Sequence, residues 1–194
     1  MPFTPFHLGP ALSLGRPFRK YMHAPTFILA NVAVDIEPFL MLFLRLNYPL
    51  HGYLHTFALA FLFGLAIGFV MFYLEKFLHL VYTVLLLEPN RMSGMKAFTV
   101  AGVLGTMIHV LLDSPLYTDV QPFFPIATNP LYNSVSPLEI YLISFWLGIL
   151  GIIFYACLFL FRTYTKARNK RQKHQPNTLS NILGQWYMTR SSTG

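Results

Sequence analysis

Long apolar segments alternate along the chain with short polar or proline-rich segments. Four of the apolar segments predict membrane-spanning helices, at about residues 25–46, 54–74, 97–112 and 138–161. The first, second and fourth reach the length of about 20 residues that a bilayer requires. The third is shorter and ends in polar residues, so we expect it to be buried among the others. The pattern therefore predicts an all-α, polytopic integral membrane helical bundle with about four transmembrane helices.

Two further apolar stretches are too short to cross a bilayer. Residues 1–15 carry three prolines and His7, and we interpret them as an N-terminal half-helix that dips into the bundle. Residues 79–87 either extend the second helix or lie along the membrane interface. We divide the chain into a membrane-embedded helical domain, 1–161, and a basic, polar cytoplasmic tail, 162–194.

The composition supports a membrane protein. The 194 residues are 55% hydrophobic and only 11% charged, whereas soluble domains carry about 25% charged residues. The single cysteine, Cys157, excludes an intrachain disulfide and a cysteine-based metal cluster.

The net charge of +7 is unevenly distributed along the chain. Basic residues precede the first apolar segment, separate the second from the third and follow the fourth, whereas residues 114–137 contain neither Lys nor Arg. The positive-inside rule then places both termini in the cytoplasm, and His51, His55 and Asp113 toward the outer face. We interpret the basic tail as a stop-transfer anchor and expect no nucleic-acid partner. The run consists of Arg162, Lys166, Arg168, Lys170, Arg171 and Lys173.

Two pairs of polar residues stand at the borders of apolar segments with the same spacing. His51 and His55 form one pair, and His109 and Asp113 form the other. On an α-helix, residues four apart share one face, so each pair predicts two neighbouring metal-capable side chains. Asp35 adds a carboxylate inside another apolar segment, and ionisable groups in such segments usually pair or bind something.

Together these residues predict a metal site within the membrane domain. Imidazole and carboxylate groups suit a divalent ion, for which we expect zinc, with manganese or iron as alternatives. The donors suffice for one ion or for two. The predicted ligands are His7, Asp35, His51, His55, His109 and Asp113.

Asp35 and Glu37 point about 200° apart on a regular helix, so they cannot both face one metal. Pro38 disfavours helical backbone at Glu37 and could supply the distortion needed. Asp35 is the better ligand. Glu37 is expected either to hold a histidine N–H or to act as the catalytic acid/base; the structural alternative is a salt bridge to Arg45.

Other features have simpler interpretations. Gly64 and Gly68, in a GxxxG pattern, and Gly102 and Gly105 predict close helix packing. The proline- and aromatic-rich loop 114–137 is either a stiff connector or a lid over the metal pocket. Chains of Asp and His also occur in proton or ion paths, although the sequence has no internal repeat of the kind found in many carriers.

Four motifs together resemble the YdjM-like family of inner-membrane, metal-dependent putative hydrolases. They are Met1-Pro-Phe-Thr-Pro-Phe-His7, Val34-Asp35-Ile-Glu37-Pro38, His51-Gly-Tyr-Leu-His55-Thr56 and His109-Val-Leu-Leu-Asp113. The resemblance covers roughly the first 125 residues. Two positions depart from the family pattern: Asp-x-Glu-Pro stands in place of Asp-x-Asp-His, and Gly52 stands where an Arg is frequent.

The resemblance implies a multi-pass protein of the cell (inner) membrane that hydrolyses an ester or phosphoester by metal-activated water. A site in the membrane favours a lipid or lipid-linked substrate, and the family's likeness to zinc-dependent phospholipase C folds suggests phosphoesters. A non-catalytic subunit of a homo-oligomer or larger membrane complex, with a structural metal or polar cluster, is one alternative. A proton-coupled carrier is another.

Overall fold

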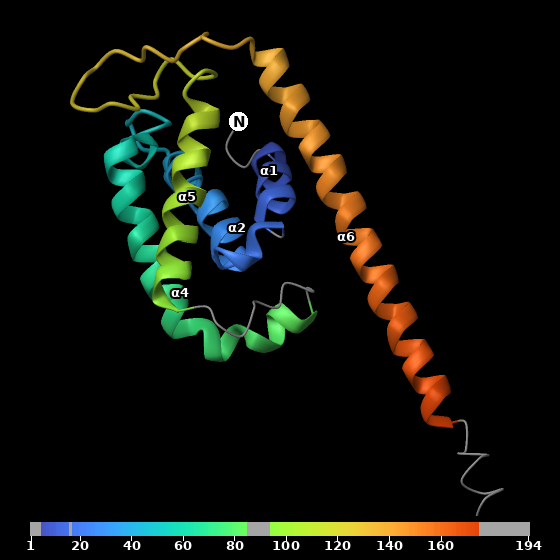
Figure 1. Cartoon of the computed structure of the whole chain (residues 1–194). Helices are drawn as coiled ribbons and strands as arrows, with labels where there is room; N and C mark the ends of the chain where they lie inside the picture. Colours follow the sequence, from blue (N-terminus) through green and yellow to red (C-terminus); the bar gives the residue numbers. More distant parts are fainter. Residues whose placement is uncertain (1–4, 16, 85–93, 175–194) are drawn as a thin grey trace, which may run out of the picture. The chain divides into compact units, whose positions relative to one another are not determined.

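The computed structural model describes residues 5–15, 17–84 and 94–174 of the chain. The described residues form helices, turns and loops and contain no strand, which confirms the predicted all-α fold (Figure 1). The elements in chain order are α1 (Pro5–Gly15), η1 (Pro17–Lys20), α2 (Ala24–Ala33), α3 (Ile36–Leu44), η2 (Tyr53–His55), α4 (Phe57–Val84), α5 (Met95–Asp113) and α6 (Pro137–His174).

The chain divides into two compact units, Met1–Phe154 and Tyr155–Gly194. The first unit contains α1 to α5 and the first half of α6. The second unit begins within α6, which remains helical to His174. The predicted division of the chain at residues 161 and 162 stays a prediction.

Four helical segments of the described chain are long and apolar enough to cross a membrane: Ala24–Leu44, Phe57–Leu78, Met95–Asp113 and Pro137–Asn169. The segment on α5 has the largest buried share of the four, as its polar end predicted. Large apolar side chains are exposed along α3, α4 and α6, including Phe43, Phe69 and Ile152. Exposed apolar surface on this scale is unusual for a soluble protein and is expected where lipid is the solvent.

Glycines allow α5 to pack closely against both α4 and α2 (Figure 1). A Cβ atom on Gly102 would collide with the backbone carbonyl oxygen of Gly64, and one on Gly105 would lie 2.6 Å from that of Phe27. Small residues let helix backbones approach in this way where apolar burial provides no driving force. The packing role predicted for these glycines is therefore confirmed.

Two buried polar side chains connect the same helices. Thr106 Oγ1 on α5 donates a hydrogen bond to the Ala60 carbonyl oxygen on α4 at 2.8 Å. Asn31 Nδ2 on α2 donates to the Gly105 carbonyl oxygen at 3.2 Å. These contacts fix α5 between its two neighbours, and α5 carries His109 and Asp113.

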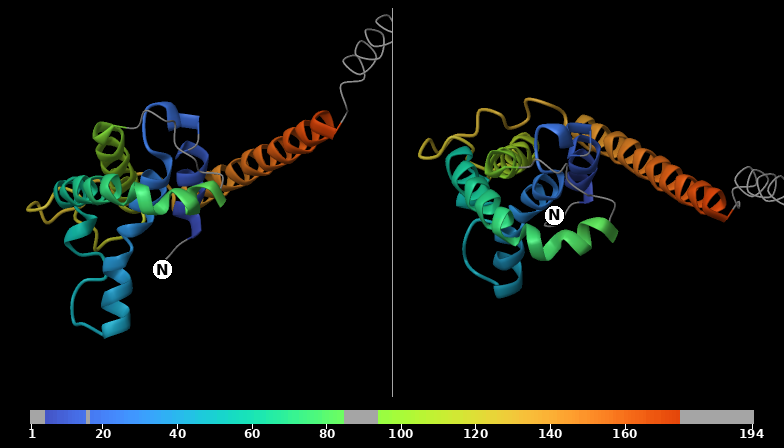
Figure 2. Two further views of the ribbon diagram at one scale, coloured as in Figure 1. Left: turned by 90° about the horizontal axis from the view of Figure 1, so that it is seen from below. Right: turned by 60° about the horizontal axis from the view of Figure 1, so that its bottom comes forward.

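The first predicted spanning segment is present as Ala24–Leu44, but turn residues at 34 and 35 interrupt its helix, which is the kind of distortion that Pro38 allowed. α2 ends at Ala33, and α3 begins at Ile36. Pro38 lies in the first turn of α3, where its missing N–H costs no helical hydrogen bond but where it prevents a continuous helix. After this break, α3 projects away from the other helices of the first unit, which Figure 2 shows in light blue.

The segment from His51 to His55 is not an α-helix, and the prediction that this pair shares one helix face is wrong. The segment contains a bend followed by the single 3-10 turn η2. Side-chain carboxylates accept the backbone N–H groups of His51 and Leu54, and such acceptors compete with helical hydrogen bonds. α4 begins only after Thr56, whose hydroxyl accepts the Leu59 N–H at 3.2 Å.

α4 continues beyond the predicted end at residue 74 as far as Val84. The stretch 79–84 therefore extends the second spanning helix, which was one of the two predicted placements. Residues 85–87 of that stretch lie outside the described residues.

Candidate metal centre

Four of the predicted ligands meet at one buried point. Asp35 stands at the break between α2 and α3, His55 ends η2, and His109 and Asp113 lie on α5. One ligand atom from each residue lies within 4.8 Å of the others, and all four side chains are buried. We call these four residues the Asp/His cluster.

The separations inside the Asp/His cluster suit a small cation. His109 Nε2 lies 3.3 Å from Asp113 Oδ2 and 3.6 Å from Asp35 Oδ1, and His55 Nε2 lies 3.7 Å from Asp113 Oδ2. Two donors on a tetrahedral zinc ion at its usual bond lengths are roughly 3.3 Å apart. The two longer separations exceed a normal hydrogen bond, so the ring nitrogen of His55 and the carboxylate of Asp35 approach the cluster without those two direct hydrogen bonds.

Glu37 orients His55 toward the cluster. Glu37 Oε2 lies 3.1 Å from His55 Nδ1 and also accepts the backbone N–H of Leu54 at 3.0 Å. A carboxylate at Nδ1 favours the tautomer that carries its proton there, so the lone pair of Nε2 faces the cluster. Among the described residues, His55 Nε2 is buried without a hydrogen-bond partner. This is the arrangement expected of a histidine that binds a metal.

The break in the helix explains how Asp35 and Glu37 reach the same site. Within the cluster, the Asp35 carboxylate faces Nε2 of His109. Glu37 lies outside the cluster and contacts Nδ1, on the far side of the His55 ring. The sequence predicted that Glu37 could hold a histidine N–H, and its contact with His55 agrees with this. The alternative, a salt bridge to Arg45, is not among the ion pairs of the described residues. Its predicted catalytic role stays a prediction.

A divalent ion fits the composition of the cluster. Two aspartates and two histidines converge in a buried volume, and carboxylates without a counter-charge are costly to bury. Neutral imidazole nitrogens and carboxylate oxygens are ligands for zinc, manganese and iron alike. The geometry therefore supports a metal site, while the identity and number of ions stay predictions.

His51 lies beside the Asp/His cluster rather than in it. Its Nδ1 is 3.0 Å from both carboxylate oxygens of Asp119, and its backbone N–H donates to Asp119 Oδ2 at 3.0 Å. The ring stacks on Tyr117, with centroids 4.2 Å apart, and meets the His55 ring edge-on at 4.8 Å. His51 is therefore not one of the four residues of the cluster, and its role as a metal ligand stays a prediction.

Asp119 is the residue that sequence reasoning missed. It stands 68 positions after His51, in a loop without periodicity, so no spacing rule connects the two. The same loop contacts the first residue of α4: the Pro122 carbonyl oxygen accepts the Phe57 N–H at 2.9 Å, and Phe123 contacts the Phe57 ring. The two predicted roles of this loop, a stiff connector or a lid over the metal pocket, both stay predictions.

Burial and hydrogen bonding change the protonation of groups around the site. Burial lowers the pKa of His55, although the hydrogen bond with Glu37 opposes this change. Partial burial alone would raise the pKa of Asp119, but the hydrogen bonds from the His51 backbone and ring hold it below its ordinary value. His55 is therefore neutral and Asp119 is ionised near neutral pH, as metal binding and the His51 contact both require.

The other predicted residues lie elsewhere. His7 lies in the first turn of α1, but its side chain lies outside the described part of the structure, so its role as a ligand stays a prediction. His23 is fully buried at the start of α2, where it stacks on Phe98 at 3.9 Å and bonds Thr26. Burial lowers the pKa of His23 to about 4. It is a packed core histidine, as its isolated position in the sequence indicates.

A mixed polar and aromatic pocket opens next to His51. Gly52 lies in its wall, and the close contacts there require a glycine: a Cβ atom would collide with the Tyr48 ring and lie 2.5 Å from Glu37 Oε1. The pocket is lined by Tyr48, Pro49, His51, Gly52, Tyr53, Thr56, Asp119, Gln121 and Phe124. We call it the Tyr48–Asp119 pocket.

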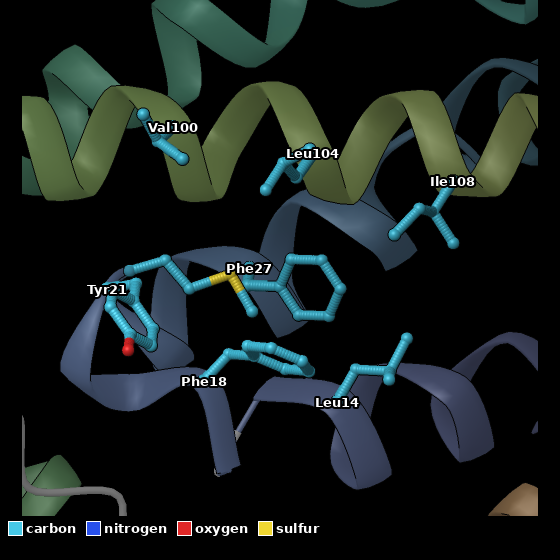
Figure 3. Close-up of a pocket in the computed structure, with 8 residues that line it drawn as sticks. Leu14, Phe18, Tyr21, Phe27, Val100, Leu104 and Ile108 are labelled. Carbon is cyan, nitrogen blue, oxygen red and sulfur yellow. The ribbon is translucent and has the colours of Figure 1, made fainter.

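A second pocket lies between α1, η1, α2 and α5 (Figure 3). Val100, Leu104 and Ile108 line it from α5, and Leu14 and Phe18 face them from the opposite side. Its lining contains no charged residue and no member of the Asp/His cluster. It is therefore not the place for metal chemistry.

Comparisons with protein-family models, curated proteins and solved structures give no match for this chain.

Proposed function

We propose that this chain is a membrane-bound, metal-dependent hydrolase of the YdjM-like class, acting on an ester or phosphoester of a lipid or lipid-linked substrate. The observation that carries the proposal is the convergence of Asp35, His55, His109 and Asp113. The buried His55 Nε2 faces the other three and has no hydrogen-bond partner among the described residues. The order of motifs in the sequence supports the same class.

The four cluster residues would hold one divalent ion, with zinc favoured by the ligand set. When bound, such an ion lowers the pKa of a water molecule and polarises an ester or phosphoryl oxygen. Glu37 fixes the orientation of His55, and Asp119 fixes that of His51 at the rim of the cluster. Burial of the cluster limits access of bulk water.

The position of the cluster supports a substrate from the membrane. Asp35 lies within one segment able to cross a membrane, and His109 and Asp113 lie at the end of another. Ester bonds of lipids lie near the ends of such segments. We propose a multi-pass protein of the inner membrane with both termini in the cytoplasm and the cluster toward the outer face, as the distribution of Lys and Arg indicates.

Metal analysis of the purified full-length chain tests the site. We expect a stoichiometric divalent ion by mass spectrometry, and a loss of affinity of at least about 100-fold in His55→Ala and in His109→Ala. His23→Phe is the matched control, because His23 is equally buried but its ring nitrogen contacts Thr26, and the ion pairs of the described residues do not include it. Retention of the ion in both cluster variants, or its absence from the wild-type protein, would contradict the site.

Turnover tests the reaction separately. The metal-loaded chain is assayed against a panel of lipid esters and phosphoesters, with His109→Ala as the inactive reference. Hydrolysis that depends on the ion and on His109 supports the hydrolase. A tightly bound ion without turnover on any substrate would instead assign the cluster a structural role in a membrane subunit.

A further inference from the structure

The walls of the Tyr48–Asp119 pocket combine aromatic rings with negative charge. The ring centroids of Tyr48 and Tyr53 are 6.1 Å apart, and those of Tyr53 and Phe124 are 5.2 Å apart, so three rings follow one another along the pocket. The three residues that carry these rings are between 39% and 50% exposed, so a ligand can reach them. Aromatic faces attract cations through their quadrupole.

Carboxylates flank these rings. The Asp119 side chain is 37% exposed in the pocket wall, and its carboxylate accepts the backbone N–H of His51 at 3.0 Å. Glu37 approaches the pocket from behind Gly52. The residues described as lining the pocket include neither Lys nor Arg. The local charge therefore repels an anion and attracts a cation.

The pocket borders the Asp/His cluster at His51. This residue lines the pocket, and its ring meets the ring of His55 edge-on at 4.8 Å. A ligand seated among the three rings would therefore carry its neighbouring groups toward the cluster. An aromatic belt at a membrane interface would also place tyrosines here, but it does not require a carboxylate in the same wall.

We propose that the Tyr48–Asp119 pocket binds an ammonium group, of the kind carried by the headgroup of a zwitterionic phospholipid or by a free quaternary amine. The rings supply cation–π contacts, and Asp119 supplies the opposite charge. Binding of the ammonium group by the pocket requires no turnover. The inference rests on the proposed function only where it makes this ammonium group part of the hydrolase substrate. It narrows the substrate class to phosphoesters with a cationic substituent.

A pair of ligands of equal shape tests the charge requirement. Choline and its neutral isostere 3,3-dimethylbutanol are titrated, by saturation-transfer NMR, into the full-length protein held in nanodiscs of phosphatidylglycerol. We expect choline to bind roughly fivefold more tightly or better. Equal binding of the two ligands, no binding of choline, or displacement of choline by inorganic phosphate would overturn the proposal.

Variants locate the binding within the pocket. Asp119→Asn preserves size and the acceptor for the His51 N–H but removes the charge, and Tyr53→Leu removes a ring; each is expected to weaken choline binding roughly threefold to tenfold. Tyr53→Phe should bind like the wild type, because the ring is kept. Tyr132→Leu is the control, since Tyr132 is exposed in the same loop but lies outside the pocket lining. If Asp119→Asn fails to fold, the two Tyr53 variants decide, and equal binding by Tyr53→Leu and wild type would contradict the site.

The nanodisc lipid distinguishes the two sources of the ammonium group. If phospholipid headgroups occupy the pocket, choline binding should weaken several-fold when phosphatidylcholine replaces phosphatidylglycerol. Equal binding in both lipids would assign the pocket to a free amine. Metal content is measured on the same samples, so loss of the ion contradicts the proposed hydrolase without affecting the result on choline.

Discussion

α5 and the segment of residues 51–55 each bring a histidine to the same buried cluster, but by different physical means. His109 and Asp113 are neighbours because a regular helix places residues four apart on one face. His55 has no such support and is held instead by Glu37, which contacts its ring and accepts the backbone N–H of the preceding residue, Leu54. The helical half of the site therefore depends on helix packing, and the other half depends on single carboxylates.

The same spacing of four residues therefore occurs in two different backbone structures, a regular helix at residues 109–113 and a non-helical segment at residues 51–55. The backbone N–H groups of His51 and Leu54 bond to side chains from distant parts of the chain. The first histidine pair consequently turns its two rings to different partners, His51 to Asp119 and His55 to Glu37. Variants that remove one kind of support should leave the other half of the site in place.

The largest effect is expected at the packing of α5. Gly102→Leu would force a side chain against the α4 backbone at Gly64, which cannot move without separating the helices. We expect destabilisation of about 3 kcal/mol, at the upper end for overpacking, together with loss of metal. Thermal unfolding in detergent and metal analysis measure the two effects. Gly94→Ala is the control, because a Cβ atom there meets nothing within 4 Å; equal stability of both variants would contradict the packing role.

Removal of the carboxylate behind His55 should have a smaller and more local effect. Glu37→Gln keeps the size of the side chain but weakens the hydrogen bond that orients the ring. Outer partners of metal-binding histidines typically contribute 10–100-fold to affinity, so we expect a loss of roughly that size, measured by competition with a chelator. Glu139→Gln, at the exposed start of α6, is the matched control. An unchanged affinity in Glu37→Gln would show that His55 needs no such support.

Periodicity and composition were sufficient to predict the helical part of the molecule. Local spacing in the sequence predicts the four apolar segments, the glycine contacts and the pair on α5. It does so because a regular helix keeps residues three or four apart on one face. Pro38 only suggested the break at Asp35. A proline is tolerated in the first turn of a helix, so its presence does not by itself determine whether a second helix precedes that turn.

The non-helical half of the site could not be predicted in the same way. The loop that carries Asp119 has no period, and its pairing with His51 joins residues 68 positions apart. Only the folded chain brings that carboxylate to the histidine. The assumed helix through residues 51–55 failed because tertiary carboxylates outcompeted the local backbone for the N–H groups.

The smallest effect on metal binding is expected for His51→Ala. This variant tests most directly whether His55 is a metal ligand and His51 is not. His51→Ala removes a ring that bonds Asp119 and touches His55 only at its edge, whereas Glu37 continues to hold His55. We expect metal affinity to change less than about threefold, because no ligand and no outer partner of a ligand is lost. Metal content and chelator competition measure this, with His109→Ala as the reference for loss of a ligand. A fall from two ions to one, or a loss as large as that of His109→Ala, would instead make His51 a ligand, as the sequence alone predicted.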